Sequence, residues 1–165
     1  MSRSLISFSC TAIYLDTMVF YALVRNIEPD AVKALFRRIE RAQITAFTSV
    51  LTFDELAYRL LLALIRDHHE GHPLDHLRSN EAELIATYYP LVAVEVERLQ
   101  TFPNLVVLDL TLTDLANMHD LILQHHLRPR DALHLASMNK CHCQNLASND
   151  ADFDRVSGIQ RFTLS

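Results

Sequence analysis

Four acidic residues lie shortly after the end of a predicted strand or near the start of a predicted helix. They are Asp16, Glu55, Asp131 and Asp150. If the predicted strands form a parallel sheet, all four carboxylates meet at its carboxyl edge, where open α/β sheets bind ligands. Crowded carboxylates cannot all ionise without compensation, and a hard divalent cation provides it. Mg²⁺ prefers oxygen ligands, and such a site can polarise a phosphoryl group and activate a water molecule.

Each of these carboxylates also has a plain structural explanation. Asp16 can form a salt bridge at the strand end or cap the helix that follows it, and Glu55 can be a solvated helix residue. Asp131 can interact with the amino terminus of its own helix. Asp150 can belong to a turn, as Asn-Asp pairs often do. The metal interpretation therefore depends on the four residues together.

The stretch Ala12–Phe20 (AIYLDTMVF) places a short apolar strand before Asp16 and a helix directly after it. An uncharged apolar run of this length is typical of a strand buried on both faces of a parallel sheet. Further strands are predicted at Ile44–Thr48, Leu105–Leu110 and Asn145–Ser148, with a last edge strand at Ile159–Thr163. Strands alternating with helices predict an α/β fold, a three-layer sandwich in which helices flank a small parallel sheet of about five strands.

The predicted helices fill the segments between these strands. They are Thr17–Leu23, a helix opened by Pro29, a long helix capped by Ser49, a helix that starts at Thr113 and Asp114, and Asp131–Lys140. The polar stretch Arg66–Arg78 contains Gly71 and Pro73 and is predicted to be a loop or a flexible hairpin. Helical segments at Asn80–Tyr89 and Leu91–Leu99 are predicted to be separated at Pro90, because proline interrupts helical hydrogen bonding.

Composition predicts one well-packed domain that spans residues 1–165. Hydrophobic residues make up 50% of the chain and charged residues 21%, which argues against disorder. Only two glycines are present, too few for the phosphate-binding loops of the Walker and dinucleotide-binding motifs. The formal net charge of −5 argues against tight, unspecific nucleic-acid binding, although bound cations would invert the charge of an acidic site.

The cysteine count and the hydropathy pattern predict a cytoplasmic protein. Cys10, Cys141 and Cys143 are too few, and odd in number, for a disulfide framework, which indicates a reducing compartment. The apolar stretch near the amino terminus is interrupted by polar residues and lacks a clear cleavage site, so it does not resemble a signal peptide. No run approaches the ~20 apolar residues of a membrane span.

The histidines and cysteines do not form a recognisable zinc motif. The segment HHEGH at residues 68–72 lacks the order of the zinc-protease motif, and Gly71 interrupts the helix that such a motif needs. Cys141-His142-Cys143 has no second pair of ligands elsewhere. His134 lies one turn beyond Asp131 and is expected to be packed, or to support the ligands of the site from behind.

Four segments in this order resemble the PIN-domain family, and more narrowly its toxin ribonucleases of the VapC type. The segments are YLDTMVFYAL, TSVLTFDELAYRL, RPRDALHLASM and ASNDADFDRV. The resemblance extends from about residue 12 to residue 162. It implies a PIN-like fold in which Asp16, Glu55, Asp131 and Asp150 bind Mg²⁺ or Mn²⁺ and cut RNA, with Asp152 or Asp154 as a further, outer contributor.

The sequence departs from the family pattern at two places. The family often has a small polar residue, commonly Asn, two positions after the first Asp, where this chain has Met18. We expect Met18 to pack beneath the metal site, since methionine fills irregular gaps, and Thr17 to orient Asp16. The region Arg66–Tyr89 is long for a compact toxin, and we expect it to influence the choice of substrate or partner.

The function implied by the resemblance is a metal-dependent endoribonuclease that acts as the toxin of a type II toxin–antitoxin pair. Its implied partners are an RNA substrate, a cognate antitoxin and a second copy of the chain in a homodimer. Scattered basic residues would contact RNA: Lys33, Arg128, Arg130 and Arg155. The alternative is a PIN-fold protein that binds RNA or regulates without cleavage. A phosphatase with Asp16 as nucleophile is disfavoured, because no second Asp follows two residues later.

Overall fold

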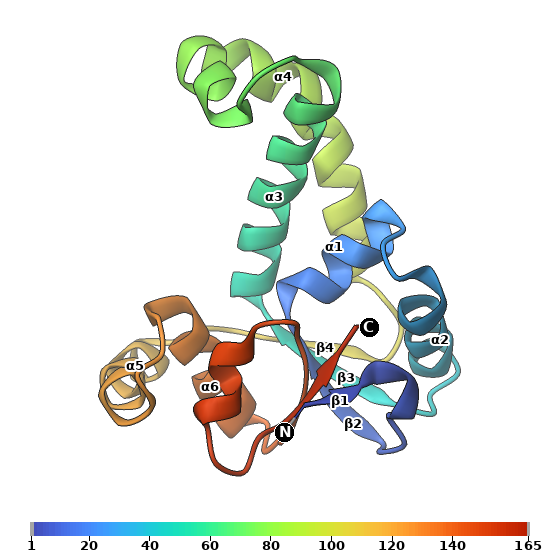
Figure 1. Cartoon of the computed structure of the whole chain (residues 1–165), viewed down its shortest axis with the longest axis vertical. Coiled ribbons are helices and arrows are strands. Elements are labelled where there is room, and N and C mark those ends of the chain that lie inside the picture. Colours follow the sequence, from blue (N-terminus) through green and yellow to red (C-terminus); the bar gives the residue numbers. More distant parts are fainter. Residues whose placement is uncertain (1, 165) are drawn as a thin grey trace.

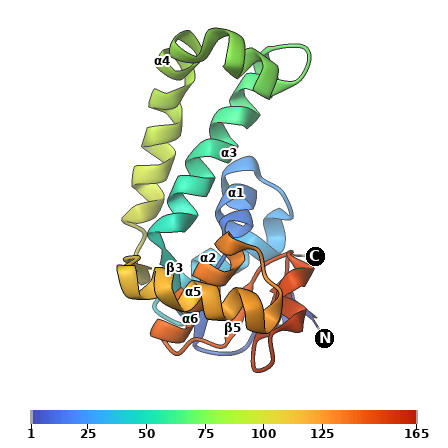
Figure 2. The ribbon, with the colours of Figure 1, turned by 90° about the vertical axis from the view of Figure 1, so that its left-hand side faces the viewer.

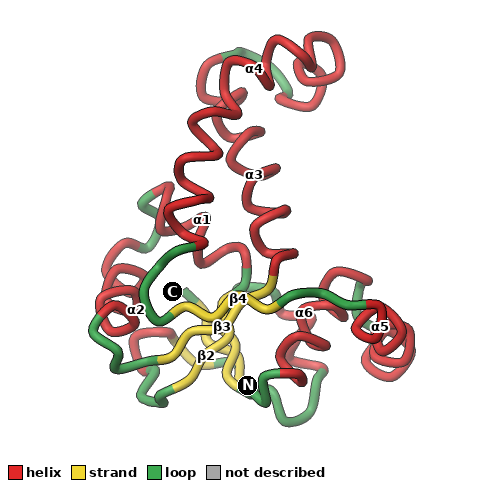
Figure 3. The backbone as a smooth tube through the Cα atoms, turned by 180° about the vertical axis from the view of Figure 1, so that it is seen from behind, coloured by secondary structure: helices red, strands yellow, loops and turns green. Residues whose placement is uncertain are grey.

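The computed structural model describes residues 2–164, and its central element is a fully parallel sheet of six strands (Figures 1 and 3). The strands are β1 (Arg3–Ser4), β2 (Ala12–Leu15), β3 (Thr45–Ser49), β4 (Leu105–Leu108), β5 (Asn145–Ala147) and β6 (Gln160–Thr163). Their order across the sheet is β1-β6-β5-β2-β3-β4. The predicted α/β sandwich is confirmed. The sheet has one strand more than the five expected, because β1 is only two residues long and has no apolar run.

The extra strand changes the place of β6 in the sheet. β1 pairs with β6 in parallel, with Arg3 opposite Phe162 and Ser4 opposite Thr163. The expectation that the last strand lies at the edge is therefore wrong, since β6 is covered on one side by β5 and on the other by β1. The two ends of the described chain consequently lie side by side.

Helices cover both faces of the sheet (Figure 1). On one side lie α1 (Thr17–Arg25) and α2 (Pro29–Glu40), and on the other lie α6 (Pro129–Lys140) and α5 (Leu112–His125), which pack against each other. Side chains of β2 alternate between the two layers. Ile13 and Leu15 belong to the core under α1 and α2, whereas Tyr14 packs against Met138 of α6. This alternation is why every residue of the run from Ile13 to Leu15 is buried.

A helical hairpin rises from the sheet and gives the molecule its elongated shape (Figures 1 and 2). It consists of α3 (Val50–His68) and α4 (Pro73–Gln100), joined by residues 69–72. The prediction of a loop or flexible hairpin over Arg66–Arg78 is therefore right only in part: a hairpin turn is present, but it is confined to residues 69–72, and the flanking residues are helical. The turn contains Gly71 at φ 100°, and Pro73 begins α4, which is the position where proline is compatible with a helix. The polar composition reflects exposure of the hairpin tip, not the absence of helix.

The predicted break at Pro90 is also wrong, because Pro90 lies inside α4 and the non-helical residue is Asn80, at φ −139° and ψ 39°. Pro90 and Ala86 are both exposed. The carbonyl of Ala86, which loses its helical partner to proline, can therefore bond to water, and this makes the proline tolerable.

Two helix starts differ from those expected. Ser49 is at the N-cap position of α3, but its side chain makes no capping hydrogen bond within residues 2–164. α5 is capped by Thr111 instead of Thr113, and Thr111 and Asp114 form a reciprocal capping box. Over the described residues, no helix combines the length and apolar character needed to cross a membrane.

Candidate metal centre

The strand order brings three chain segments to one edge of the sheet. β2 lies between β5 and β3, and the chain reverses its direction across the sheet after β4, when it crosses β2 to reach β5. The carboxyl ends of strands at such a switch point form a crevice. Asp16 follows β2 directly, Glu55 lies in the second turn of α3 after β3, and Asp150 lies three residues beyond β5. Asp131 joins them from the first turn of α6.

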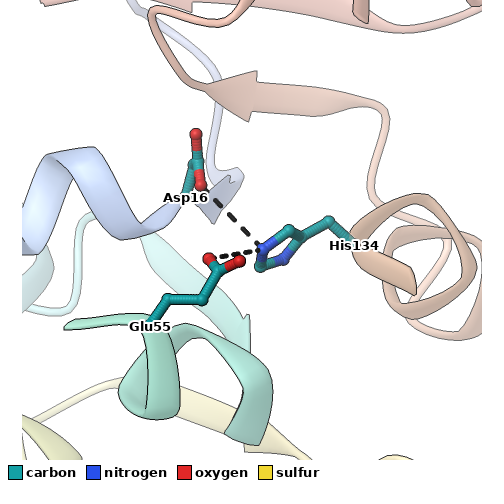
Figure 4. A group of neighbouring side chains, drawn as sticks. All are labelled: Asp16, Glu55 and His134. Atoms are coloured by element: carbon teal, nitrogen blue, oxygen red, sulfur yellow. Dashed lines mark hydrogen bonds and ion pairs between the residues drawn. The ribbon is translucent and has the colours of Figure 1, made fainter. Parts of the chain in front are cut away.

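The first group of possible ligands is Asp16, Glu55 and His134, whose nearest ligand atoms lie within 4.8 Å of one another (Figure 4). Asp16 caps α1: its Oδ1 accepts from the amide of Thr17 at 2.6 Å, and its Oδ2 accepts from the hydroxyl of Ser148 at 2.6 Å. The hydroxyl of Thr17 donates to Oε2 of Glu55 at 2.5 Å. Nε2 of His134 lies 3.3 Å from the same oxygen and 4.0 Å from Oδ1 of Asp16.

The second group is Asp131, Asp150 and Asp152, again within 4.8 Å of one another. Asp150 begins the 3-10 helix η2 (Ala151–Arg155), where its Oδ1 accepts from the amide of Asp152 at 2.9 Å. Asp152 is paired with Arg155 at 2.8 Å. The structural roles considered for Asp16 and Asp150, a helix cap and a turn residue, are thus present together with their convergence on the site.

Two of these carboxyl groups, Asp131 and Glu55, have pKa values that are shifted in opposite directions. Burial raises the pKa of Asp131 from 3.8 to about 6, and the negative charge of Asp150 adds to this shift. Burial also acts on Glu55, but the hydrogen bonds from His134 and Thr17 outweigh it and hold the pKa of Glu55 below its usual range. His134 is likewise buried, yet its bond to Glu55 and the charge of Asp16 raise its pKa. Of Asp131 and Glu55, Asp131 is therefore the carboxylate whose charge is less well compensated by its protein partners.

The residues present fit a divalent cation. Oδ2 of Asp131 is a buried acceptor without a hydrogen-bond partner in the part of the chain that the structure describes. A buried polar atom without a partner lowers the stability of the fold by about 1–3 kcal/mol, and by more when it is charged. A ligand bound to such an atom would remove this penalty. The surrounding donors are carboxylate oxygens, which Mg²⁺ and Mn²⁺ prefer. A cation beside Asp131 would reverse the effect of Asp150 on its pKa.

The structure brings the four sequence-predicted residues together as two pairs. Asp16 lies with Glu55, and Asp131 lies with Asp150. The two pairs are close enough for the charge of Asp16 to contribute to the raised pKa of Asp131. Between the two outer contributors considered, Asp152 joins Asp131, whereas Asp154 is turned away into an ion pair with Arg161 at 2.7 Å.

Sequence reasoning missed the residues that hold the carboxylates in place. Ser148 and Tyr14 have no motif of their own: Ser148, which bonds to Asp16, directly follows β5, and Tyr14, which bonds to His134, lies within β2. The amide of Thr17 donates to Asp16, which caps α1, and the hydroxyl of Thr17 donates to Glu55. The expectation for Met18 is not met: its sulfur contacts Arg59 of α3 at 3.2 Å, and the residue lines a surface cavity between α1 and the hairpin.

The basic residues near the site are few. Arg130 reaches Oε1 of Glu55 at 3.4 Å with a side chain that is 62% exposed. Arg128 precedes α6 directly, and Arg155 bonds to the carbonyl of His126 at 3.0 Å as well as to Asp152. Lys33 belongs to α2, in the layer on the other side of the sheet from α6. Of the basic residues predicted to contact RNA, the three arginines therefore lie around the carboxylates and Lys33 does not.

The sequence matches the family model described as PIN domain over residues 13–159. No curated protein sequence matches it. Among solved structures, a chain of DNA-bound VapBC from Salmonella typhimurium is similar with a TM-score of 0.63 and 15% identity, covering 94% of this chain and 100% of that one. A chain of VapBC2 from Rickettsia felis, bound to a promoter DNA fragment, is similar with a TM-score of 0.61 and 12% identity, and the match covers 93% of this chain and 98% of that one.

A third similar structure is VapC20 from Mycobacterium tuberculosis, described as a toxin that cleaves the sarcin-ricin loop. It has a TM-score of 0.55 and 18% identity, and the match covers 86% of this chain and 92% of that one. At such identities the likeness establishes the fold.

Proposed function

Because the chain belongs to the PIN-domain family, we propose that it is an endoribonuclease dependent on Mg²⁺ or Mn²⁺ and the toxin of a type II toxin–antitoxin pair. The observation that carries this proposal is the convergence of carboxylates from four separate segments in two groups, one of which contains Oδ2 of Asp131, a buried oxygen without a hydrogen-bond partner among residues 2–164. The likeness to VapBC structures, and to a toxin described as cleaving the sarcin-ricin loop, supports the choice of RNA as substrate.

In this proposal the ligands are Asp16, Glu55, Asp131 and Asp150. A bound divalent cation supplies polarisation of the scissile phosphate and a water molecule of lowered pKa. The protein supplies orientation: the amide of Thr17 and the hydroxyl of Ser148 fix both oxygens of Asp16. No serine, cysteine or histidine nucleophile is needed, since water is the attacking group.

The arginines around the site give it a means to hold a polyanion. Arg128 and Arg130 are exposed at the start of α6, beside Asp131. In a chain of net charge −5, this local basic region is where we expect phosphate groups to approach the carboxylates. Single-stranded or looped RNA is the form that can bring a bent backbone to such a crevice.

We further propose that a cognate antitoxin binds this chain and that the chain forms a homodimer. The support is the likeness to VapBC assemblies, and for the dimer the family resemblance alone. The antitoxin would be identified by a short reading frame that lies beside the gene for this chain and encodes a DNA-binding head. Co-expression of its product should relieve the growth arrest that induction of this chain causes.

RNA cleavage by the purified protein tests the enzymatic proposal. We expect cleavage of structured RNA with Mg²⁺ or Mn²⁺ and none with excess chelator. Asp131→Asn should lower the rate by more than about 100-fold, because even residues that only support metal ligands contribute about 10- to 100-fold. The matched control is Asp54→Asn, which changes an exposed carboxylate on α3 next to Glu55.

Two results would contradict this assignment. Cleavage that persists in chelator would remove the metal from the mechanism, and full activity of Asp131→Asn would remove this residue from the ligands. RNA binding by the wild type without cleavage, at any concentration of either cation, would favour the regulatory, non-cleaving alternative.

A further inference from the structure

His134 is a residue of α6 whose side chain points towards Asp16 and Glu55 (Figure 4). The residue is only 2% exposed. Nδ1 lies 3.0 Å from the hydroxyl of Tyr14, which is itself fully buried, and Nε2 lies 3.3 Å from Oε2 of Glu55. A continuous path of hydrogen bonds therefore runs from the centre of the sheet to one ligand.

The chemistry of the three groups fixes the direction of these bonds. A carboxylate can only accept, so the hydrogen between His134 and Glu55 belongs to Nε2. In the neutral imidazole Nδ1 is then an acceptor, and the hydroxyl of Tyr14 must donate to it. Burial raises the pKa of Tyr14, so this phenol keeps its proton. The order is Tyr14 to His134 to Glu55, with each group donating to the next.

The path determines which oxygen of Glu55 remains available. Oε2 accepts from both His134 and the hydroxyl of Thr17. Oε1 has Arg130 at 3.4 Å, and this side chain is 62% exposed and able to move into solvent. The two fixed donors thus hold one oxygen and leave the other for a cation.

We propose that Tyr14 and His134 are positioning residues that orient Glu55 so that its Oε1 atom, rather than Oε2, binds the cation. The proposal rests on the metal centre proposed above and extends it to residues that do not touch the cation. The closest rival assigns Nε2 of His134 itself as a ligand, since it lies within reach of the same carboxylates. An imidazole ligand would favour Mn²⁺ over Mg²⁺, whereas a positioning residue affects both cations alike.

Metal binding by three variants tests the proposal without any measurement of activity. Isothermal titration of the folded protein with Mg²⁺ and with Mn²⁺ gives the two dissociation constants. Tyr14→Phe removes one oxygen and keeps the ring, and should weaken both cations by about two- to tenfold. His134→Leu removes the donor to Glu55 and should weaken both by about 10- to 100-fold. His134→Gln, which retains a donor, should recover part of that loss.

Tyr58→Phe is the matched control, because Tyr58 is 48% exposed on α3 and contributes to neither ligand group. If His134→Leu does not fold, Tyr14→Phe still decides the question. The ¹⁵N spectrum of the histidines gives a direct readout, with the His134 signals identified from their loss in His134→Gln. We expect hydrogen on Nε2 in the Mg²⁺-loaded wild type.

Each contrary outcome has a distinct meaning. Wild-type affinities in Tyr14→Phe and His134→Leu, or hydrogen on Nδ1 alone, would overturn the positioning role and leave the proposed nuclease intact. A loss of Mn²⁺ affinity much greater than the loss of Mg²⁺ affinity would make His134 a ligand and also overturn it. A wild type that binds neither cation would overturn this inference and the proposed function together.

Discussion

Asp131 is held in surroundings that disfavour its own charge. Burial and the nearby charge of Asp150 raise its pKa to about 6, and its Oδ2 atom has no partner within residues 2–164. A cation bound beside such a group should stabilise the folded protein, because its charge relieves the same repulsion that raises the pKa of the group. Asp131 thus lowers the stability of the metal-free fold, and we propose that it does so because it serves as a ligand of the cation.

This environment predicts a pH dependence for the metal-free protein. The pKa of Asp131 is higher in the folded state than the usual ~3.9 of an unfolded chain. Its ionisation therefore destabilises the fold at neutral pH, and the contribution of Asp131 to the unfolding free energy should rise as pH falls from about 7 to about 4. The shift sets an upper bound of ~3 kcal/mol, and because the residue is partly exposed we expect about 1 kcal/mol.

Asp131→Asn should remove this contribution. In chelator at pH 7 the variant should be more stable than the wild type by about 1 kcal/mol, and at pH 4 the two should be equal. Urea denaturation between pH 4 and pH 7.5 measures the difference, with Asp54→Asn as the control. His134 contributes a slope of the same sign in both proteins, since its pKa is also raised. A constant difference across the pH range would contradict the assignment.

At the scale of elements, α5 depends on a single amino-terminal cap. The hydroxyl of Thr111 and the carboxylate of Asp114 bond at 2.7 Å, and Asp114 also accepts from the amide of Thr111 and from Lys140 of α6. The carboxylate is buried, so losing a donor is costly. The same cluster fixes α5 to the helix that carries Asp131 and His134.

Thr111→Ala should lower the unfolding free energy by about 1 kcal/mol, the usual cost of an N-cap. Thr113→Ala is the matched control, because Thr113 is exposed in the first turn of the same helix, and it should cost less than about 0.5 kcal/mol. Denaturant titration of both variants measures the difference. Neither change should alter the affinity for Mn²⁺, since α5 provides no residue to the two ligand groups. Equal losses would mean that the cap was assigned to the wrong threonine.

Sequence patterns predicted the elements well where local physics decides them. The apolar run at residues 13–15 and the position of Pro129 identify β2 and the start of α6, because burial and the fixed φ of proline are local properties. β1 was missed since two polar residues become a strand only through pairing with β6, more than 150 positions away. At the hairpin tip, polarity indicates a loop or a flexible hairpin where the structure has helix on both sides of a short turn, because this polarity reflects exposure in the folded protein.

The candidate site shows the same division. Asp16, Glu55, Asp131 and Asp150 could be chosen because each lies at an element boundary, and the boundaries of a parallel sheet share an edge. Their separation into two pairs could not be predicted from the sequence, since it depends on side-chain directions and on the helix that carries each residue. Tyr14 was an ordinary strand residue in the sequence, and only the packing of α6 brings it to His134.

At the scale of the whole molecule, the four proposed ligands come from segments that extend over most of the chain. The family match covers residues 13–159, and β1 and β6 extend the same sheet beyond both limits. We therefore propose that residues 1–165 form one domain. A cation held by Asp16, Glu55, Asp131 and Asp150 would connect α1, α3, α6 and the start of η2, so that its binding stabilises the fold as a whole.

Mn²⁺ should accordingly raise the melting temperature of the wild type. At a free concentration of 100 times the dissociation constant, binding to the folded state alone stabilises it by about 2.7 kcal/mol. In a chain of this length, 1 kcal/mol shifts the midpoint by ~2–4 °C, so we expect a rise of about 5–10 °C. Differential scanning calorimetry across a Mn²⁺ titration measures it.

The control for this experiment is Asp131→Asn, which should begin with a higher midpoint in chelator and respond little to Mn²⁺. Without metal the variant should therefore have the higher melting temperature, and with bound Mn²⁺ the wild type should have the higher one. That crossing requires one residue to be both a source of repulsion and a ligand. Parallel curves, with equal shifts in both proteins, would place any bound Mn²⁺ away from Asp131, and an unchanged wild-type midpoint would count against the whole carboxylate site.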